Sequence, residues 1–124
     1  MNTVEIMGIL MRVLQTRSFN YADEKLCQIE IEQLLQDKGI TYLREHNFGD
    51  GVGVCDFLLP RSGIVLEAKA FKTWSKKEVF RQCERYCSRS EVNGLLLATG
   101  KAQGLPDTIG GKPARVYLLG LGAL

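Results

Sequence analysis

The sequence predicts an α/β protein in which a mixed central sheet is flanked by helices. Segments with helical periodicity alternate with short runs of β-branched and aliphatic residues that glycine or proline bounds. Their predicted order is α-αβββαβ-β. A chain of 124 residues with 45% hydrophobic and 24% charged residues has an ordinary globular composition, so we expect a single domain over residues 1–124.

The first predicted helix covers Thr3–Thr16, with Thr3 as its N-cap. Its apolar stripe consists of Val4, Met7, Met11 and Leu14. The segment is too short and too charged to span a membrane, and it lacks the basic start and cleavage site of a signal peptide. A helix this apolar must pack somewhere. We expect it to cover the sheet of its own domain or, as a sharper hypothesis, to form the contact of a homodimer through Val4–Leu14.

The second predicted helix covers Tyr21–Lys38 and ends at Gly39 in the C′ position. Its buried stripe consists of Cys27, Ile31, Leu34 and Leu35. At about 100° per residue, Glu24 falls on this stripe and Gln28 lies at its edge. We therefore rank Glu24 first as the functional residue of this helix, and Gln28 second.

Two further glutamates of this helix lie on opposite flanks of the stripe. They are Glu30 and Glu32. Glu30 ranks third, after Gln28. For all of these polar residues the alternative is a solvated or capping role, and for Glu30 and Glu32 that alternative is favoured.

Five strands are predicted after these helices. They are Ile40–Glu45, Val54–Leu59, Ile64–Ala70, Leu95–Thr99 and Ala114–Leu119. A helix separates the third from the fourth. At its start Ser75 and Glu78 form a capping box, and Trp74 with Val79 has the spacing of a hydrophobic staple. This crossover makes Leu95–Thr99, a continuous apolar run, a central strand parallel to the third. Residues 100–113 are expected to form a long loop.

Three ionisable residues interrupt two of these apolar strands. Asp56 lies inside the second strand, and alternation puts Glu67 and Lys69 on the same face of the third. Burying an unpaired charge destabilises the fold by roughly several kcal/mol, unless a shift of the pKa neutralises the group. Something must therefore compensate these three groups.

A divalent metal would compensate two carboxylates and a lysine together. Asp56 and Glu67 are hard oxygen ligands, the carbonyl of Ala68 adds a third, and the open positions suit water and phosphate, as Mg²⁺ prefers and Mn²⁺ accepts. Lys69 could orient or deprotonate a water molecule held by the metal, or stabilise charge on the phosphate. The pattern indicates phosphodiester hydrolysis. From spacing alone, the alternative is a buried cluster that neutralises itself.

These residues carry a resemblance. Asp56, a ten-residue gap and then Glu67-Ala68-Lys69 resemble the D…(D/E)-x-K signature of the PD-(D/E)XK nuclease superfamily. In the following helix, residues Gln82 to Tyr86 resemble the QxxxY motif of the RecB-like branch, in the same order and position. The family's proline before the aspartate is absent, since Cys55 stands there. The resemblance covers roughly residues 21–119 and implies a restriction-endonuclease-like αβββαβ core.

The resemblance also implies a function. The protein would be a Mg²⁺-dependent deoxyribonuclease with endonuclease activity, related to phage or to DNA repair and recombination. In it Asp56 and Glu67 bind the metal, Lys69 acts on water or phosphate, and Gln82 and Tyr86 position the scissile strand. Many members place an acidic residue on the first core helix facing the metal, which is the role implied for Glu24. In the resolvases it comes nearer the helix-ending glycine, about where Gln28 stands.

Other functions remain open at this point. One alternative is a catalytically inactive nucleic-acid-binding module of the same fold. Another is an endonuclease similar to Holliday-junction resolvases, which would need a dimer to cut two strands. The third is a small-ligand α/β protein with an internally neutralised polar cluster. No base-reading motif is visible, so the sequence does not select duplex, single-stranded or branched DNA, or RNA.

Basic residues are concentrated beside the predicted site. Residues 69–89 contain seven lysines and arginines against two glutamates. The predicted contacts with a phosphate backbone are Lys72 and a ridge of Lys77, Arg81, Arg85 and Arg89, which recur every four residues. A solvated helix face is the alternative. The single histidine, His46, opens the glycine-rich connector His46–Gly53. It is a candidate base or phosphate contact, although a lone loop histidine is usually neither.

The chain contains four cysteines, none of them in a C-x-x-C pair: Cys27, Cys55, Cys83 and Cys87. All lie in apolar segments, so we interpret them as reduced core residues of a cytoplasmic protein. Some RecB-like nucleases bind an iron–sulfur cluster through four cysteines. In those proteins most of the cluster cysteines lie after the QxxxY helix, whereas here none does, so the placement disfavours a cluster.

Overall fold

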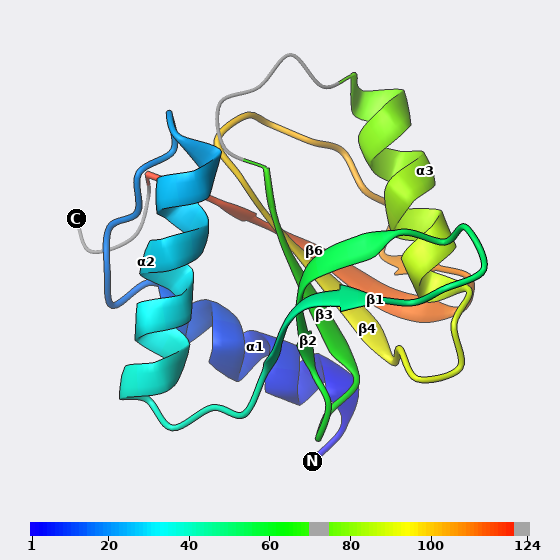
Figure 1. Ribbon diagram of the computed structural model, residues 1–124, viewed down its shortest axis with the longest axis horizontal. Helices are drawn as coiled ribbons and strands as arrows, with labels where there is room; N and C mark the ends of the chain where they lie inside the picture. The colour runs from blue at the N-terminus through cyan, green and yellow to red at the C-terminus, as the bar shows by residue number, and fades with distance from the viewer. Residues whose placement is uncertain (70–74, 121–124) are drawn as a thin grey trace.

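The computed structural model describes residues 1–69 and 75–120, and over these residues the chain forms an α/β fold (Figure 1). Its elements are α1 (Thr3–Leu14), α2 (Glu24–Asp37), β1 (Leu43–Asn47), β2 (Val54–Leu59), β3 (Ile64–Lys69), α3 (Lys76–Cys87), β4 (Gly94–Thr99), β5 (Thr108–Ile109) and β6 (Lys112–Leu118). The predicted αβββαβ order and the mixed sheet flanked by helices are confirmed.

The six described strands form one sheet in the order β1-β2-β3-β4-β6-β5. β1, β2 and β3 are antiparallel neighbours, whereas β4 pairs parallel to both β3 and β6. The predicted parallel pairing after the helical crossover is therefore confirmed, with Ile64 opposite Gly94 and Lys69 opposite Thr99. β3 and β4 are buried along their whole length because helices cover both faces of the sheet centre.

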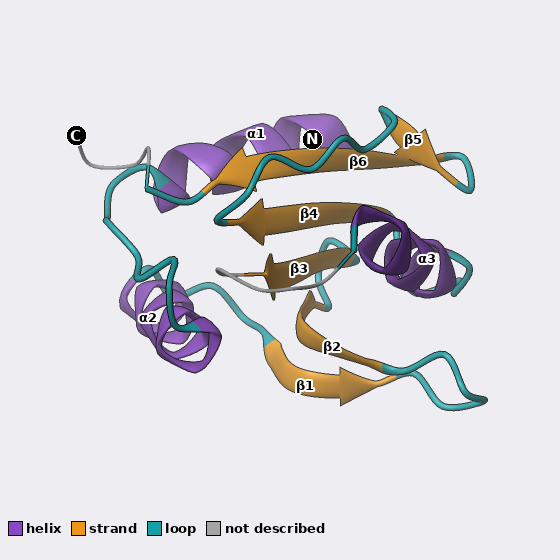
Figure 2. Cartoon of the chain, turned by 90° about the horizontal axis from the view of Figure 1, so that it is seen from above, coloured by secondary structure: helices purple, strands orange, loops and turns teal. Residues whose placement is uncertain are grey.

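Two hydrophobic clusters lie on opposite faces of the sheet. One joins α1 and α2 to Ile64, Leu66 and Ala68 of β3, and the other joins α3 to Val65 of the same strand. Figure 2 shows α2 and α3 on opposite sides of the strands. The alternation predicted for β3 is confirmed, and it puts Glu67 and Lys69 on the α3 side.

Helix α1 packs on its own sheet, as predicted. Met7, Leu10 and Leu14 are buried, and the helix contacts β4 and β6. The homodimer contact through this helix stays a prediction. No helix among the described residues has the length and apolar character needed to cross a membrane.

Several predicted boundaries were wrong. The N-cap of α1 is Asn2, which forms a capping box with Glu5, so Thr3 is already helical. α2 begins at Glu24 because the Asp23 carboxylate accepts a hydrogen bond from the Leu26 amide and caps the helix there.

Further shifts lie after α2. The left-handed Gly39 ends the helix as predicted, but the first strand begins only at Leu43 and includes His46, which we had assigned to the connector. The predicted loop 100–113 contains β5, and its last residues open β6. α3 begins after the predicted Ser75 cap. The Trp74 staple lies outside the described residues, as does Ala70 at the end of the third predicted strand.

Candidate metal and phosphodiester site

Asp56 and Glu67 interlock where β2 and β3 meet. The Asp56 amide donates to Glu67 Oε1 at 2.8 Å, and the Ala68 amide donates to Asp56 Oδ2 at 2.7 Å. Each carboxylate thus accepts a hydrogen bond from the strand that carries the other. The structure brings together all three residues predicted to hold a metal.

The regular pairing of the sheet is interrupted at Asp56. β1–β2 pairing passes from Arg44–Phe57 to His46–Cys55 without a Glu45–Asp56 pair, and β2–β3 pairing starts only at Phe57–Leu66. Cys55 belongs to the α3-side cluster but Phe57 to the opposite one, so the alternation of faces also breaks there. The interruption leaves backbone amides free to donate hydrogen bonds to the two carboxylates.

Burial disfavours the ionised form of both carboxyls. Burial raises the pKa of Asp56 to about 6, with Glu24 adding to the rise and the Ala68 amide and Lys69 opposing it. Burial and the neighbouring Asp56 raise the pKa of Glu67 to about 8, against the opposing charge of Lys69. Added positive charge would relieve this destabilisation of the ionised pair.

Lys69 shares the face of Glu67, as predicted. Its Nζ lies 3.4 Å from Glu67 Oε2, and both residues are buried, at 7% and 2% exposed. A buried lysine against a buried carboxylate supplies one positive charge to a group of negative ones. The position is close enough to the carboxylates for the ammonium to act on a phosphate that they help to bind.

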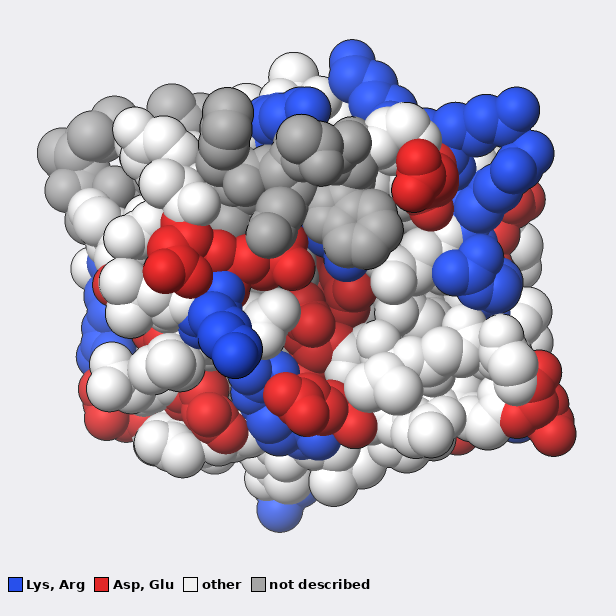
Figure 3. All heavy atoms as spheres, turned by 45° about the horizontal axis from the view of Figure 1, so that its top comes forward, with Lys and Arg blue, Asp and Glu red and all other residues white. Residues whose placement is uncertain are grey.

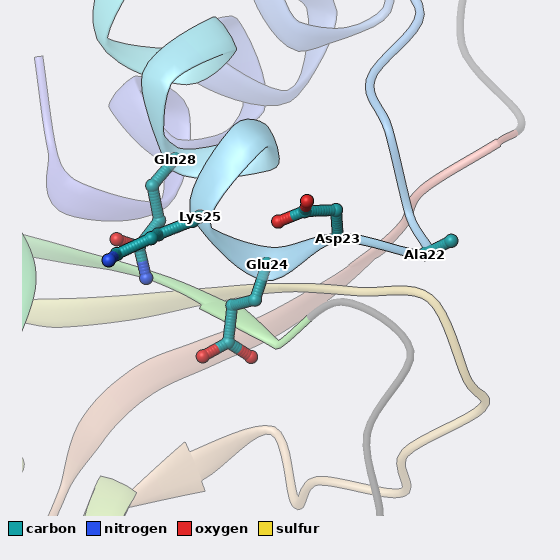
Figure 4. A pocket seen from close by; sticks show the side chains of 5 residues that line it. All are labelled: Ala22, Asp23, Glu24, Lys25 and Gln28. Atoms are coloured by element: carbon teal, nitrogen blue, oxygen red, sulfur yellow. The ribbon is translucent and has the colours of Figure 1, made fainter.

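Helix α2 brings two side chains toward Asp56. Gln28 donates through Nε2 to Asp56 Oδ1 at 3.2 Å. Glu24, in the first turn, projects away from the helix (Figure 4), and its charge raises the pKa of Asp56. Together they help to line a cavity of about 550 Å³ with Ala22, Asp23 and Lys25. Glu30 instead accepts from the Asn20 amide, and Glu32 from the Tyr42 hydroxyl.

The donor set fits a hard divalent cation. Glu24 Oε1 is buried and has no hydrogen-bond partner among the described residues, which is an unusual state for a carboxylate oxygen and one that a cation would satisfy. Within residues 1–69 and 75–120, no three side chains of histidine, cysteine, aspartate or glutamate converge closely enough to hold a metal by themselves. A cation here would therefore rest on Asp56, Glu67 and the Ala68 carbonyl, with water completing its shell, as Mg²⁺ commonly does.

The two QxxxY residues lie in different settings. Tyr86 is fully buried, and its hydroxyl donates to the Val54 carbonyl at 2.7 Å, which ties α3 to the start of β2. Gln82 is half-buried and lines a surface pocket of about 280 Å³ with Glu78, Arg81 and Arg85. The structure thus gives Tyr86 a contact that supports the sheet beside the carboxylates, while Gln82 remains accessible from outside.

The predicted basic ridge is shorter than the sequence suggested. Lys77, Arg81 and Arg85 are exposed on α3, and Arg85 also donates to the Val52 carbonyl at 3.2 Å. Arg89 lies beyond the end of α3 at Cys87, with its Nη1 3.6 Å from Asp50 Oδ2 and its Nε 3.5 Å from Glu91 Oε1, and its predicted contact with a phosphate backbone stays a prediction. Lys72 lies outside the described residues. Figure 3 shows acidic side chains in a hollow, with basic side chains along part of its border.

His46 and the cysteines lie among structural contacts. The His46 ring packs edge-on against Phe48, with Nε2 3.8 Å from Glu91 Oε2, and no contact among the described residues joins it to the carboxylate pair. All four cysteines are free and buried, as predicted, and burial raises the pKa of each thiol, for example that of Cys83 to about 12.

Sequence reasoning missed Arg44. Its guanidinium donates to the Asp56 carbonyl and to Gln28 Oε1. Its position in the chain holds no signal for this, since the contacts depend on how β1 and α2 meet beside β2.

Comparison of the sequence and the structure with protein-family models, with curated proteins and with solved structures finds no significant match.

Proposed function

We propose that this protein is a divalent-metal-dependent deoxyribonuclease of the PD-(D/E)XK type. The observation that carries the proposal is the interlocked pair of the half-buried Asp56 and the buried Glu67, which lies beside Lys69. Burial raises the pKa of both carboxyls, and the two carboxylates lie close enough for Asp56 to raise the pKa of Glu67 further, so a bound cation would stabilise the ionised pair. The free buried cysteines are typical of a cytoplasmic protein.

Each residue would have a distinct role. Asp56, Glu67 and the Ala68 carbonyl would hold Mg²⁺ or Mn²⁺, with Glu24 adding negative charge at the edge of the site. The metal would supply Lewis-acid polarisation of the phosphate. The Lys69 ammonium, close to Glu67 Oε2, would stabilise charge on the phosphate or orient the attacking water. Gln82 would contact the strand that is cut, and Tyr86 would support the sheet beneath it.

A metal-dependent cleavage assay tests the proposal. We expect the protein to cut at least one substrate from a panel of duplex, single-stranded and branched DNA in Mg²⁺ or Mn²⁺, and to cut none of them with a chelator present. RNA in the same panel tests the sugar preference. Binding to DNA without cleavage in either metal would contradict the proposal and favour an inactive binding module.

The exposed basic residues of α3 are expected to bind the phosphate backbone. Replacing Arg81 and Arg85 with alanine should weaken DNA binding regardless of sequence, because each lost duplex phosphate contact removes roughly 0.9 from the slope of log affinity against log salt. Fluorescence anisotropy in chelator, over a range of salt concentrations, measures this slope. The control removes two exposed arginines elsewhere, Arg12 on α1 and Arg61 in the β2–β3 turn. An unchanged slope in the α3 variant would identify a solvated face.

A further inference from the structure

Arg44 holds Asp56 at two points. Its Nη1 donates to the Asp56 carbonyl at 3.3 Å, and its Nη2 donates to Gln28 Oε1 at 2.9 Å. Gln28 in turn donates to Asp56 Oδ1 at 3.2 Å. The guanidinium therefore reaches the backbone of Asp56 directly and its carboxylate through one amide.

The backbone beside Arg44 is strained where it faces Asp56. Glu45, the next residue, has φ of 51° and lies at the interrupted position of the β1–β2 pairing. A non-glycine residue in the left-handed region persists only where the surrounding contacts hold it. This kink occurs at the point where Arg44 reaches the neighbouring strand.

The Arg44 side chain is itself firmly anchored. Its guanidinium carbon lies 4.8 Å from the centre of the Phe57 ring, and its nitrogens lie 3.8 Å from Glu32 and 3.7 Å from Glu45. Only 24% of the side chain is exposed. The planar guanidinium packs on the Phe57 ring and lies near two carboxylates, so its orientation is fixed. A lysine ammonium could not reproduce this geometry.

We propose that Arg44 is the positioning residue of the metal site, acting with Gln28 to fix the orientation of the Asp56 carboxylate. The inference rests on the proposed function. Gln28 donates a hydrogen bond to Asp56 Oδ1 and the Ala68 amide donates one to Oδ2, so the carboxylate cannot rotate freely. These contacts fix its orientation at the position where the regular strand pairing is interrupted. Residues that orient a ligand in this way set the affinity of the site for its metal.

The first experiment needs no metal. The Ala68 amide donates to Asp56 Oδ2 at 2.7 Å, so its proton resonance reports the carboxylate orientation. In chelator, Arg44→Met and Gln28→Leu should each move this resonance upfield and speed its hydrogen exchange, while amides of β4 keep theirs. Arg61→Met, the same exchange at an exposed site, is the control and should change nothing.

The second experiment measures Mn²⁺ affinity by calorimetry. Arg44→Met and Gln28→Leu should each weaken binding about ten- to a hundredfold. Because the two residues act in series on Oδ1, the double variant should bind little more weakly than Arg44→Met alone. Arg44→Lys keeps the positive charge and should keep the fold, but it lacks the planar guanidinium, so it should lose Mn²⁺ affinity as Arg44→Met does. It replaces Arg44→Met in the test if that variant does not fold.

The outcomes separate this inference from the proposed function. A wild-type Ala68 resonance in folded Arg44→Lys and Gln28→Leu would overturn the positioning role, as would unchanged Mn²⁺ affinity in both. If the wild type bound no Mn²⁺, the metal site of the proposed function would fail, and the Ala68 resonance would still decide whether Arg44 orients Asp56.

Discussion

Asp56→Asn is expected to abolish DNA cleavage in Mg²⁺ and in Mn²⁺, and Glu67→Gln should do the same. Each change removes one of the two anionic ligands from a site where a cation has little else to bind. The amide side chains keep the size and can still accept the backbone hydrogen bonds, so the fold should be retained. Single-turnover cleavage and circular dichroism measure the two effects, and retained cleavage in either variant would contradict the metal assignment.

The same variant gives a stability test with a definite sign. The folded-state pKa of Asp56 is raised to about 6 from an ordinary 3.8, so ionisation destabilises the metal-free fold as the pH rises through that interval. Asp56→Asn should thus be more stable than the wild type in chelator at pH 8, by up to about 3 kcal/mol at 1.36 kcal/mol per pKa unit. At pH 4 the gain should largely vanish.

Thermal melting at these two pH values measures the gain. Mn²⁺ should stabilise the wild type at pH 8 but not the variant. Glu24→Gln is a matched control, since it removes a nearby negative charge without removing either carboxylate of the pair. A variant less stable than the wild type at pH 8 would mean that the two carboxylates are already compensated in the folded protein.

Lys69→Met should remove turnover while leaving metal binding intact. The ammonium lies 3.4 Å from Glu67 Oε2 and is positioned to act on phosphate or water, a contribution of about 10²- to 10⁴-fold to the rate. Methionine retains the length and apolar character of the stem, so packing should be little disturbed. Removing a positive charge beside Glu67 should leave Mn²⁺ affinity unchanged or slightly higher.

Single-turnover rates and Mn²⁺ calorimetry on the same protein separate the two effects. Lys38→Met, at an exposed lysine at the opposite end of α2 from Glu24, is the control and should cut at the wild-type rate. If Lys69→Met lost metal affinity as severely as Asp56→Asn, the lysine would be organising the ligands rather than acting in the reaction.

The sequence by itself determined the fold class and which residues form the centre of the candidate site. Local signals are strong there: Ser75 caps the start of α3, Gly39 follows the end of α2, and the alternation of β3 puts Glu67 and Lys69 on one face. These features depend on neighbours along the chain, through capping, left-handed glycine and the two-residue repeat of a strand. The αβββαβ order follows from them because the crossover helix forces a parallel pair.

Only the tertiary structure decided which neighbours hold the carboxylates. The interrupted pairing at Asp56, the reach of Arg44 and the choice of Gln28 as the α2 contact depend on how three elements meet. The helix boundaries mattered as well, since Glu24 lies in the first turn of α2 because Asp23 caps it, and Arg89 falls beyond α3. A periodic pattern predicts on which face of a helix or strand a residue lies. The residues that it contacts belong to the element packed against that face, and local sequence does not determine this packing.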